Sequence, residues 1–552
     1  MLVRKIYVFS VLLLLSVAGI SQEALAKTIT LTSQRQLTIE MVNEVANGQA
    51  QVALSGDAKK NVQAGYDAVM QAALNNKAVY GLTVGVGWNK DKPVFHEANG
   101  QKILSPELLQ LSRAFNASSL RAHASGLGQP LSEHIVRASM VIRLNTFLNG
   151  EAGVSPAVAQ QYVDFLNKKI TPVVPEKGSV GEADITLASH IGLAMVGEWD
   201  VFYGGKRIPA QQAMRRAGVK PLVPVGKDFL SILSTNSLMA AQAVDVLNQS
   251  QRFYDKQVKL FALMLEGFDG NVAPFSHSAV DARPYPAMQK AAADIRAALA
   301  GSDLWRPDGK RALQDPLSYR SMAYSLGELG EANQQLRANL LIQINHTDDN
   351  PLVLIHGLAA GDNSPQMQQY EVNGSGSAAI VPTSNFNFLP VARSASQLNE
   401  AMAKLAEVMT QQLIRMENPD MTKLPRFLAA AQNEGHAFGA IQKPFVAVNQ
   451  EIKTLAQPLW FSGATVAGNI EDTVSMSNQI LMNSHAIVDG LYDISAFQLL
   501  HATQALDLCK GFQAGGSSRE LKRRYRQQVP FISEDTATTK IIETSKYFWM
   551  QY

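Results

Sequence analysis

The sequence is poor in cysteine and in charge. Cys509 is the only cysteine, so the chain can form no internal disulfide and offers no set of thiolates to a metal. The 10 histidines have no H-x-x-E-H or similar ligand spacing, so no metal cofactor is expected. Charged residues make up 17% of the chain and the net charge is +2. This low share of charged residues indicates that part of the protein surface is buried in contacts between subunits. The net charge is close to zero, which gives no reason to expect nucleic acid as a partner.

Apolar runs long enough to span a membrane are also lacking. Basic residues precede one apolar run, residues 6–20, which is short for a spanning helix. Ala24 and Ala26 place small residues where a signal peptidase cuts. We therefore predict a signal peptide over residues 1–26, cut after Ala26, with an uncleaved anchor as the alternative. The mature protein is expected to be periplasmic or secreted, with no membrane partner.

Helical periodicity, by contrast, dominates most of the chain. Apolar residues recur at steps of four and three from Leu398 to Met416, which marks one face of a helix, and Pro419 follows its end. Ser394 and Gln397 are predicted to form a capping box at the start of this helix.

Two further stretches, residues 324–344 and 475–508, are predicted to be long helices with one apolar face. Strand-like alternation is confined to short pieces such as residues 28–31. The fold class that this pattern predicts is mainly α, with a bundle of long antiparallel helices. We expect residues 27–230 to form an N-terminal active-site domain with a glycine-rich loop, and residues 231–552 to form the central bundle and a C-terminal helical tail.

The glycine-rich loop at residues 80–87 (YGLTVGVG) does not match a phosphate-binding motif. Its spacing is neither G-x-G-x-x-G nor that of a P-loop, so a nucleotide site is not expected. The glycines favour positive φ and close backbone approach. A mobile loop that carries one tyrosine, Tyr80, is also able to place an acid or base over a pocket.

Several charged residues allow a structural and a functional interpretation. Lys443 lies in an apolar-rich run, where it either extends to solvent or is buried with a lowered pKa. Glu471 and Asp472 precede a predicted helix, where carboxylates interact favourably with the helix dipole. Asp348 and Asp349 are typical of a turn or a cap, which we favour over a cation site because adjacent side chains point apart.

Eight short segments, in this order along nearly the whole mature chain, resemble motifs of the histidine and aromatic amino-acid ammonia-lyases. Each match alone is weak, and the shared order is what makes the resemblance specific. The segments are residues 80–87, 122–126, 178–181, 283–286, 314–320, 349–352, 385–386 and 471–476. The resemblance implies a homotetramer of long helices in which each active site is built from several subunits.

The resemblance also implies roles for individual residues. Tyr80 matches the loop tyrosine that acts as acid or base, and Arg320 matches the arginine that grips the substrate carboxylate, a task suited to a planar fork of donors. Glu471 matches the glutamate of histidine-specific members, which accepts an imidazole N–H. The further residues expected to contact substrate are His123, Phe386, Gln314 and Asn236, the last within a Ser234-Thr235-Asn236 segment that departs from the family's Asn-Gly-Thr.

One departure from the family concerns its prosthetic group. Members that make the methylidene-imidazolone electrophile cyclise an Ala-Ser-Gly tripeptide directly after Gly-Ser-Val-Gly. Here Gly181 is followed by Glu182-Ala183-Asp184, a stretch that is one residue shorter and has no Ser-Gly. No serine is present to supply the electrophilic carbon, so this group is not expected. Leu317 also stands where the family has a tyrosine, and Lys443 stands where ordinary members are apolar.

Without the electrophile, the substrate must have a better leaving group than an ammonium ion. A trimethylammonium group departs as a neutral amine and needs no proton. The resemblance therefore implies an ergothionase-type reaction, in which ergothioneine (2-thio-histidine betaine) gives thiolurocanate and trimethylamine. In this hypothesis Tyr80 removes the β-proton, while Lys443 and Glu471 bind and polarise the thio-imidazole.

Two alternatives remain open at this point. One is elimination of ammonia from another aromatic or histidine-like amino acid. The other is a non-catalytic secreted binding protein, which loss of the prosthetic residues favours. Retention of Tyr80, Arg320 and Glu471 together opposes that second alternative, because binding alone does not need a loop tyrosine.

Overall fold

The computed structural model describes residues 27–75, 77–86, 89–90, 92, 106–372, 378–459 and 465–552. Across these residues the chain is mainly helical with a few short strands, which confirms the predicted fold class. The predicted signal peptide lies outside the described residues, as does Gly87 of the glycine-rich loop.

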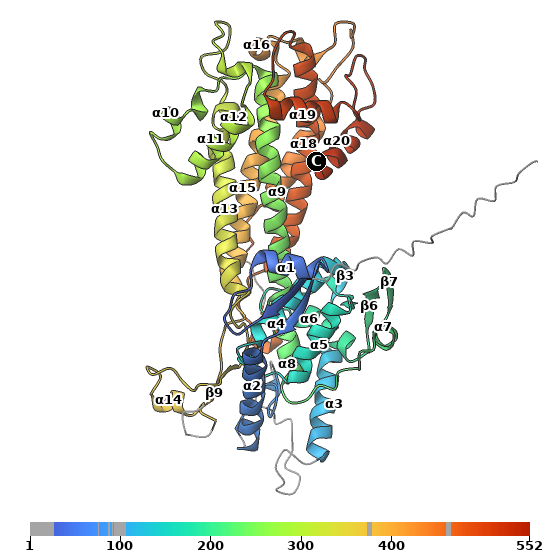
Figure 1. Cartoon of the computed structure of the whole chain (residues 1–552), viewed down its shortest axis with the longest axis vertical. Coiled ribbons are helices and arrows are strands. Elements are labelled where there is room, and N and C mark those ends of the chain that lie inside the picture. The colour runs from blue at the N-terminus through green and yellow to red at the C-terminus, as the bar shows by residue number, and fades with distance from the viewer. Residues whose placement is uncertain are drawn as a thin grey trace, which may run out of the picture.

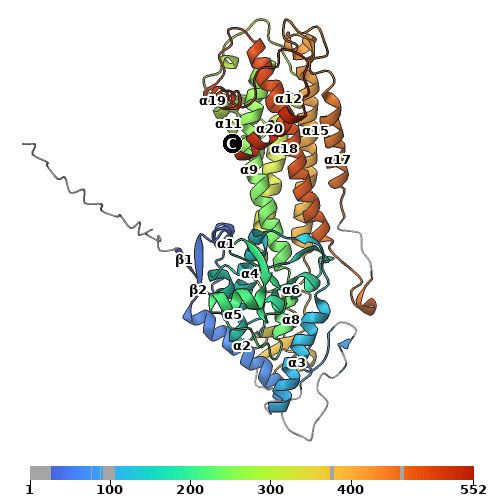
Figure 2. The same ribbon diagram turned by 90° about the vertical axis from the view of Figure 1, so that its right-hand side faces the viewer.

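Long helices form a bundle that runs through the upper part of the molecule (Figures 1 and 2). Consecutive long helices run in opposite directions, and each packs on its neighbours along most of its length. The bundle consists of α9 (Ser237–Phe268), α13 (Met322–Gln343), α15 (Leu389–Met416), α17 (Gln442–Leu455) and α18 (Ser477–Leu508).

Shorter helices and strands build the region below the bundle in Figure 1. The expected domain boundary at residue 230 falls inside α8 of this region. Its helices are α1 (Ile39–Ala46), α2 (Gly56–Leu74), α3 (Pro106–His123), α4 (Glu133–Phe147), α5 (Pro156–Asn167), α6 (Ile185–Met195), α7 (Ala210–Ala217) and α8 (Asp228–Leu233).

Within the described residues the strands make four small sheets rather than one layer. β1 (Lys27–Leu31) and β2 (Ala50–Leu54) pair in parallel, and the remaining pairs are antiparallel. Those pairs involve β3 (Leu127–Pro130) with β5 (Pro175–Lys177), β6 (Asp200–Tyr203) between β4 (Thr171–Pro172) and β7 (Lys206–Pro209), and β8 (Leu352–Leu354) with β9 (Ala379–Val381).

Short helices surround the far end of the bundle (Figure 1). They are α10 (His277–Val280), α11 (Pro286–Ala298), α12 (Leu317–Arg320), α16 (Pro419–Thr422), α19 (Gly516–Tyr525) and α20 (Thr539–Gln551), while α14 (Pro365–Gln368) lies near β9 at the other end. The 3₁₀ turns are η2 (Ala273–Phe275), η3 (Asp303–Trp305), η4 (Arg426–Leu428) and η5 (Ala467–Asn469).

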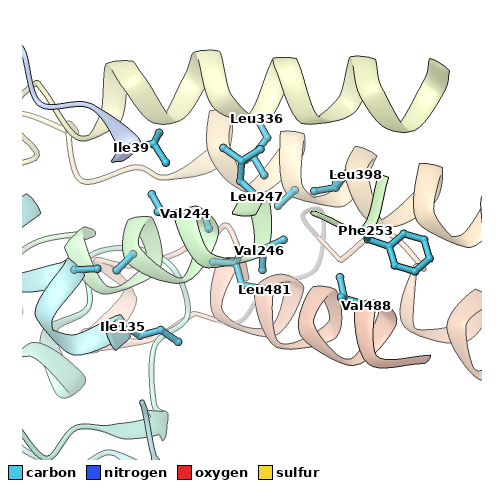
Figure 3. Packing of buried hydrophobic residues seen from close by; sticks show 14 of the residues in the cluster. Ile39, Ile135, Val244, Val246, Leu247, Phe253, Leu336, Leu398, Leu481 and Val488 are labelled. Carbon is cyan, nitrogen blue, oxygen red and sulfur yellow. The ribbon is translucent and has the colours of Figure 1, made fainter. Parts of the chain in front are cut away.

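Helix α9 is the centre of the hydrophobic core. Figure 3 shows Val246 and Leu247 of α9 between Leu336 of α13, Leu398 of α15 and Leu481 of α18, and all five side chains are buried. By length and composition the helical stretch Asp228–Phe268, which covers α8 and α9, is apolar enough to cross a membrane, but 94% of its most apolar window is buried inside the protein. Burial of this apolar surface stabilises the fold by about 25 cal/mol per Å² removed from water.

The predicted apolar face from Leu398 to Met416 is confirmed, because the Leu and Met residues along it are buried. The predicted capping box is wrong. Helix α15 begins at Leu389, one turn and more before Ser394. Ser394 Oγ instead donates to the Pro390 carbonyl inside the helix at 3.0 Å.

A buried ion network ties the lower region to the start of the bundle. Arg143 of α4 is 1% exposed, and its Nη1 donates to Asp348 Oδ1 at 2.7 Å and to Asp349 Oδ2 at 3.0 Å. Lys227 Nζ, also buried, lies 3.5 Å from Asp349 Oδ1. The turn-and-cap interpretation of the two aspartates was therefore incomplete, since both are enclosed ion-pair partners.

The same network holds the first turn of α9. Asp348 Oδ2 accepts from Thr235 Oγ1 at 2.8 Å and from the Asn236 backbone N–H at 2.6 Å. Because Asn350 follows these aspartates, the network also fixes the loop that carries it. Two acidic and two basic groups balance here, which is what allows such charges to be buried.

Replacement of Arg143 tests this arrangement. Arg143→Met should lower the free energy of unfolding by about 3–5 kcal/mol, because two buried carboxylates lose their main partner. The midpoint of urea-induced unfolding at fixed protein concentration measures the change. The matched control is Arg207→Met, which removes an exposed pair with Asp200 and should cost less than about 1 kcal/mol. Equal midpoints for the two variants would show that the buried ion network contributes no more to stability than an exposed ion pair.

Candidate active site

A cavity of about 510 Å³ opens where the lower region meets the start of the bundle. Its wall comes from segments far apart in the sequence. They are the Tyr80 loop, the end of α3, residues 178–186, residues 384–387 and residues 466–473. Four of the predicted site residues line it together: Tyr80, His123, Phe386 and Glu471.

The loop that carries Tyr80 is closed by its own backbone. Tyr80 forms an isolated parallel bridge with Val84, and the Gly81 N–H donates to the Val84 carbonyl at 3.1 Å. Gly81 has a φ of 72°, and a Cβ there would overlap the Leu230 side chain. The predicted need for positive φ and close approach is therefore confirmed at Gly81.

His123, the last residue of α3, has a defined tautomer. Its Nδ1 lies 2.7 Å from the Ser119 carbonyl, which only accepts, so Nδ1 carries the proton. A neutral ring then presents Nε2 as an acceptor. Burial raises the pKa of Glu471, and the nearby His123 opposes that rise. The pKa of the Glu471 carboxyl therefore lies above its usual value, because the effect of burial exceeds that of His123.

The turn at residues 178–184 is locked against the segment before α18. Ser475 Oγ donates to the Gly181 carbonyl at 2.9 Å, and the Met476 N–H donates to the Val180 carbonyl at 2.9 Å. Gly181 has a φ of 94°, and a Cβ there would overlap the hydroxyls of Ser475 and Ser477. Only glycine fits this position without displacement of the neighbouring chain.

Asp184 anchors the other side of the same turn. This fully buried carboxylate accepts from Ser179 Oγ at 3.0 Å and from the Met239 N–H in the first turn of α9 at 3.1 Å. Its own N–H donates to the Thr235 carbonyl at 2.6 Å. Burial raises the pKa of Asp184 to about 7. Ser179 and Asp184 are therefore structural partners that fix the turn.

Glu182 is a cavity residue that sequence reasoning did not select. It was considered only as part of the altered tripeptide, yet it lines the cavity and is 7% exposed. Burial, with repulsion from Glu471 as a further cause, raises the pKa of Glu182 to about 7. Its position directly after Gly-Ser-Val-Gly was the signal that would have identified it.

The other predicted residues do not reach this cavity within one chain. Arg320 Nη1 donates to Gln314 Oε1 at 2.6 Å near the far end of the bundle. Lys443 is exposed at the start of α17, next to Gln442, which hydrogen-bonds Glu417 just beyond the end of α15. The cavity residue Phe386 precedes the start of α15. Helix α15 has 28 residues, so the cavity at its start lies about 40 Å from Arg320 and Lys443 near its end.

Asn236 is near the cavity but not part of its wall. It is fully buried at the start of α9, and neither polar atom of its side chain has a hydrogen-bond partner among the described residues. Ser234, two residues before, does line the cavity. The side-chain amide of Asn236 is therefore available to hydrogen-bond a ligand that enters the cavity on the side of Ser234.

Comparison with known proteins agrees with this architecture. Residues 37–527 match the model of the aromatic amino acid lyase family. Histidine ammonia-lyase from Geobacillus sp. (strain WCH70) is 30% identical over 512 residues, which cover 92% of this chain and 94% of that protein. The chain belongs to the aromatic amino acid lyase family, and it is a carbon–nitrogen lyase.

Solved structures give the same result. The ergothioneine-degrading enzyme ergothionase from Treponema denticola is 32% identical, with a TM-score of 0.87 and coverage of 95% of this chain and 99% of that one. Histidine ammonia-lyase from Trypanosoma cruzi is 21% identical, with a TM-score of 0.78 and coverage of 95% and 93%, and this match concerns the fold alone.

Proposed function

We propose that the protein eliminates trimethylamine from ergothioneine to give thiolurocanate, as an exported enzyme of the periplasm or the cell exterior. The observation that carries this proposal is the turn after Gly181. Glu182-Ala183-Asp184 stands there in place of Ala-Ser-Gly, in a cavity that keeps Tyr80 and Glu471. The ergothionase from Treponema denticola, whose structure was solved with desmethyl-ergothioneine sulfonic acid, has a closely similar fold and supports the same substrate.

The residues at this turn do not fit the family's prosthetic group. Cyclisation to the electrophile needs a serine within the tripeptide, and Glu182-Ala183-Asp184 contains none. The neighbouring Ser179 is engaged with Asp184 through its hydroxyl. We therefore route no step through such a group, and assign the reaction to ordinary side chains and a labile C–N bond.

In the proposed reaction the Tyr80 oxygen, as phenolate, takes the β-proton. The electron pair of the Cβ–H bond becomes the new double bond, and the Cα–N bond breaks. Nitrogen keeps its bonding pair and leaves as neutral trimethylamine, so no acid is needed for departure. Glu471 accepts the ring N–H, which lets the thione take up electron density as the proton leaves, and Phe386 contacts the trimethylammonium by cation–π attraction of about 0.5–2 kcal/mol.

We further propose that the active site is completed by other copies of the chain in a homotetramer. Arg320 would hold the substrate carboxylate, assisted by Gln314, and Lys443 would lie near the sulfur or serve as an acid. The distance of about 40 Å along α15 supports this, because these residues cannot reach Tyr80 in their own chain. Exposure of Lys443 is then the state of an isolated chain.

Turnover of ergothioneine tests the reaction directly. The enzyme should release trimethylamine while absorbance at the thiolurocanate band rises, and Tyr80→Phe should lower kcat by about 10²–10⁴-fold because the base is lost. Tyr203→Phe, which changes a tyrosine of β6 outside the cavity, is the matched control and should keep full activity. Efficient ammonia release from plain histidine, with no turnover of ergothioneine, would contradict the proposed substrate.

Subunit complementation tests the shared site. Tyr80→Phe and Arg320→Met should each be inactive alone. When the two are co-expressed in equal amounts, about a quarter of the sites should contain both wild-type residues if these come from different subunits. Tyr80→Phe with Glu471→Gln is the control, because both residues line one chain's cavity and no site should recover. Absence of recovery in the first pair as well would overturn the shared site.

A further inference from the structure

Glu182 has a backbone-determined position on the cavity wall. Gly181 before it and Ala183 after it both have left-handed backbone conformations, with φ of 94° and 56°. Glu182 also forms an isolated antiparallel bridge with Asn387, the residue after Phe386. The backbone of Glu182 is therefore fixed beside the segment that carries Phe386, and both residues line the cavity.

The cavity wall of a single chain is acidic. Its titratable residues are Tyr80, His123, Glu182, Glu471 and Asp472, and no Lys or Arg belongs to the described part of the wall. Glu182 and Glu471 are close enough to repel each other. Such a wall favours a ligand that brings a positive charge, since a cation relieves this repulsion and the cost of burying a carboxylate.

We propose that Glu182 is the binding residue for the cationic α-nitrogen of the substrate, in the place that the family's electrophile occupies. This inference rests on the proposed function for the identity of the cation, the trimethylammonium of ergothioneine. Glu471 is left for the ring, and Arg320 for the carboxylate. The three charged or polar ends of the substrate then each have a partner of matching chemistry.

Glu182 is expected to act in substrate binding and not in the chemical step. Glu182 attracts a charge that is present in bound ergothioneine and disappears as trimethylamine leaves. An interaction made with the ground state and lost in the reaction lowers KM without raising kcat. In the active enzyme, Glu182→Gln should therefore raise KM for ergothioneine by about tenfold or more and leave kcat within about threefold of its original value.

Affinity should also depend on pH. With a pKa of about 7 in the free enzyme, Glu182 is protonated below that pH and must lose its proton to attract a cation. Cation binding lowers this pKa, so affinity for ergothioneine should rise as pH increases toward about 7 and level off above it. The other titratable residues of this wall are Tyr80, His123, Glu471 and Asp472, so the contribution of Glu182 is the part of this dependence that Glu182→Gln abolishes.

The decisive experiment compares two ligands in the full-length Tyr80→Phe protein, where turnover is blocked. The ligands are ergothioneine and its desamino analogue, 2-thio-imidazolepropionate, which has the same ring and carboxylate but no cationic nitrogen. Adding Glu182→Gln should weaken ergothioneine by about tenfold in Kd and change the analogue by less than about threefold. Glu133→Gln, at an exposed carboxylate of α4 outside the cavity wall, is the matched control and should change neither.

Equal weakening of both ligands would assign Glu182 a merely structural role and overturn the inference, as would unchanged affinity for ergothioneine. A different result would reject the proposed substrate without rejecting the role of Glu182. If the parent protein binds histidine but not ergothioneine, the same comparison is made between histidine and imidazolepropionate. A selective loss for histidine in Glu182→Gln would then uphold the role of Glu182 while the proposed substrate is abandoned.

Discussion

The cavity depends on charges that are buried and fully paired at the junction of the two parts of the molecule. Arg143 and Lys227 hold Asp348 and Asp349, and Asp348 in turn accepts from the backbone N–H of Asn236, directly before α9. An unpaired charge at this depth would cost several kcal/mol, so the four groups form one unit. The start of the bundle and the loop before Pro351 are fixed together, and the cavity lies between them.

Another buried carboxyl group, Asp184, links the turn at residues 178–184 to the start of α9. It joins Ser179 of the turn to Met239 of α9, while Ser475 and Met476 close the turn from the side of α18. Two long helices therefore position a few residues of irregular backbone. Rigid placement matters for chemistry that has no prosthetic group, since ordinary acids and bases act efficiently only when they are held in reach of the reacting atoms.

Sequence reasoning identified the fold and part of the site, for different physical reasons. Periodicity identified the buried face from Leu398 to Met416 because a helix repeats its environment every three or four residues. It misplaced the start of α15, where Asn387 Oδ1 accepts from the Leu389 N–H and Pro390 fits the first turn. That hydrogen bond is made by a loop residue outside the periodic pattern.

Other features could not be derived from the sequence because they depend on distant segments. The burial of Arg143 results from partners more than two hundred positions away. Glu182 lies on the cavity wall between two residues with left-handed backbone conformations. The separation of Arg320 and Lys443 from Tyr80 appears only once α15 is seen to run between them. Motif order identified these residues, but it contained no information on which chain supplies each.

The central claim is that elimination proceeds on an unmodified backbone after Gly181. The most direct measurement is the mass of the tryptic peptide that extends from Gly178 to Lys206, taken from a preparation that releases trimethylamine from ergothioneine. The account predicts the mass of the genetically encoded peptide. A mass lowered by loss of water, with the change located at Glu182 to Asp184, would contradict it.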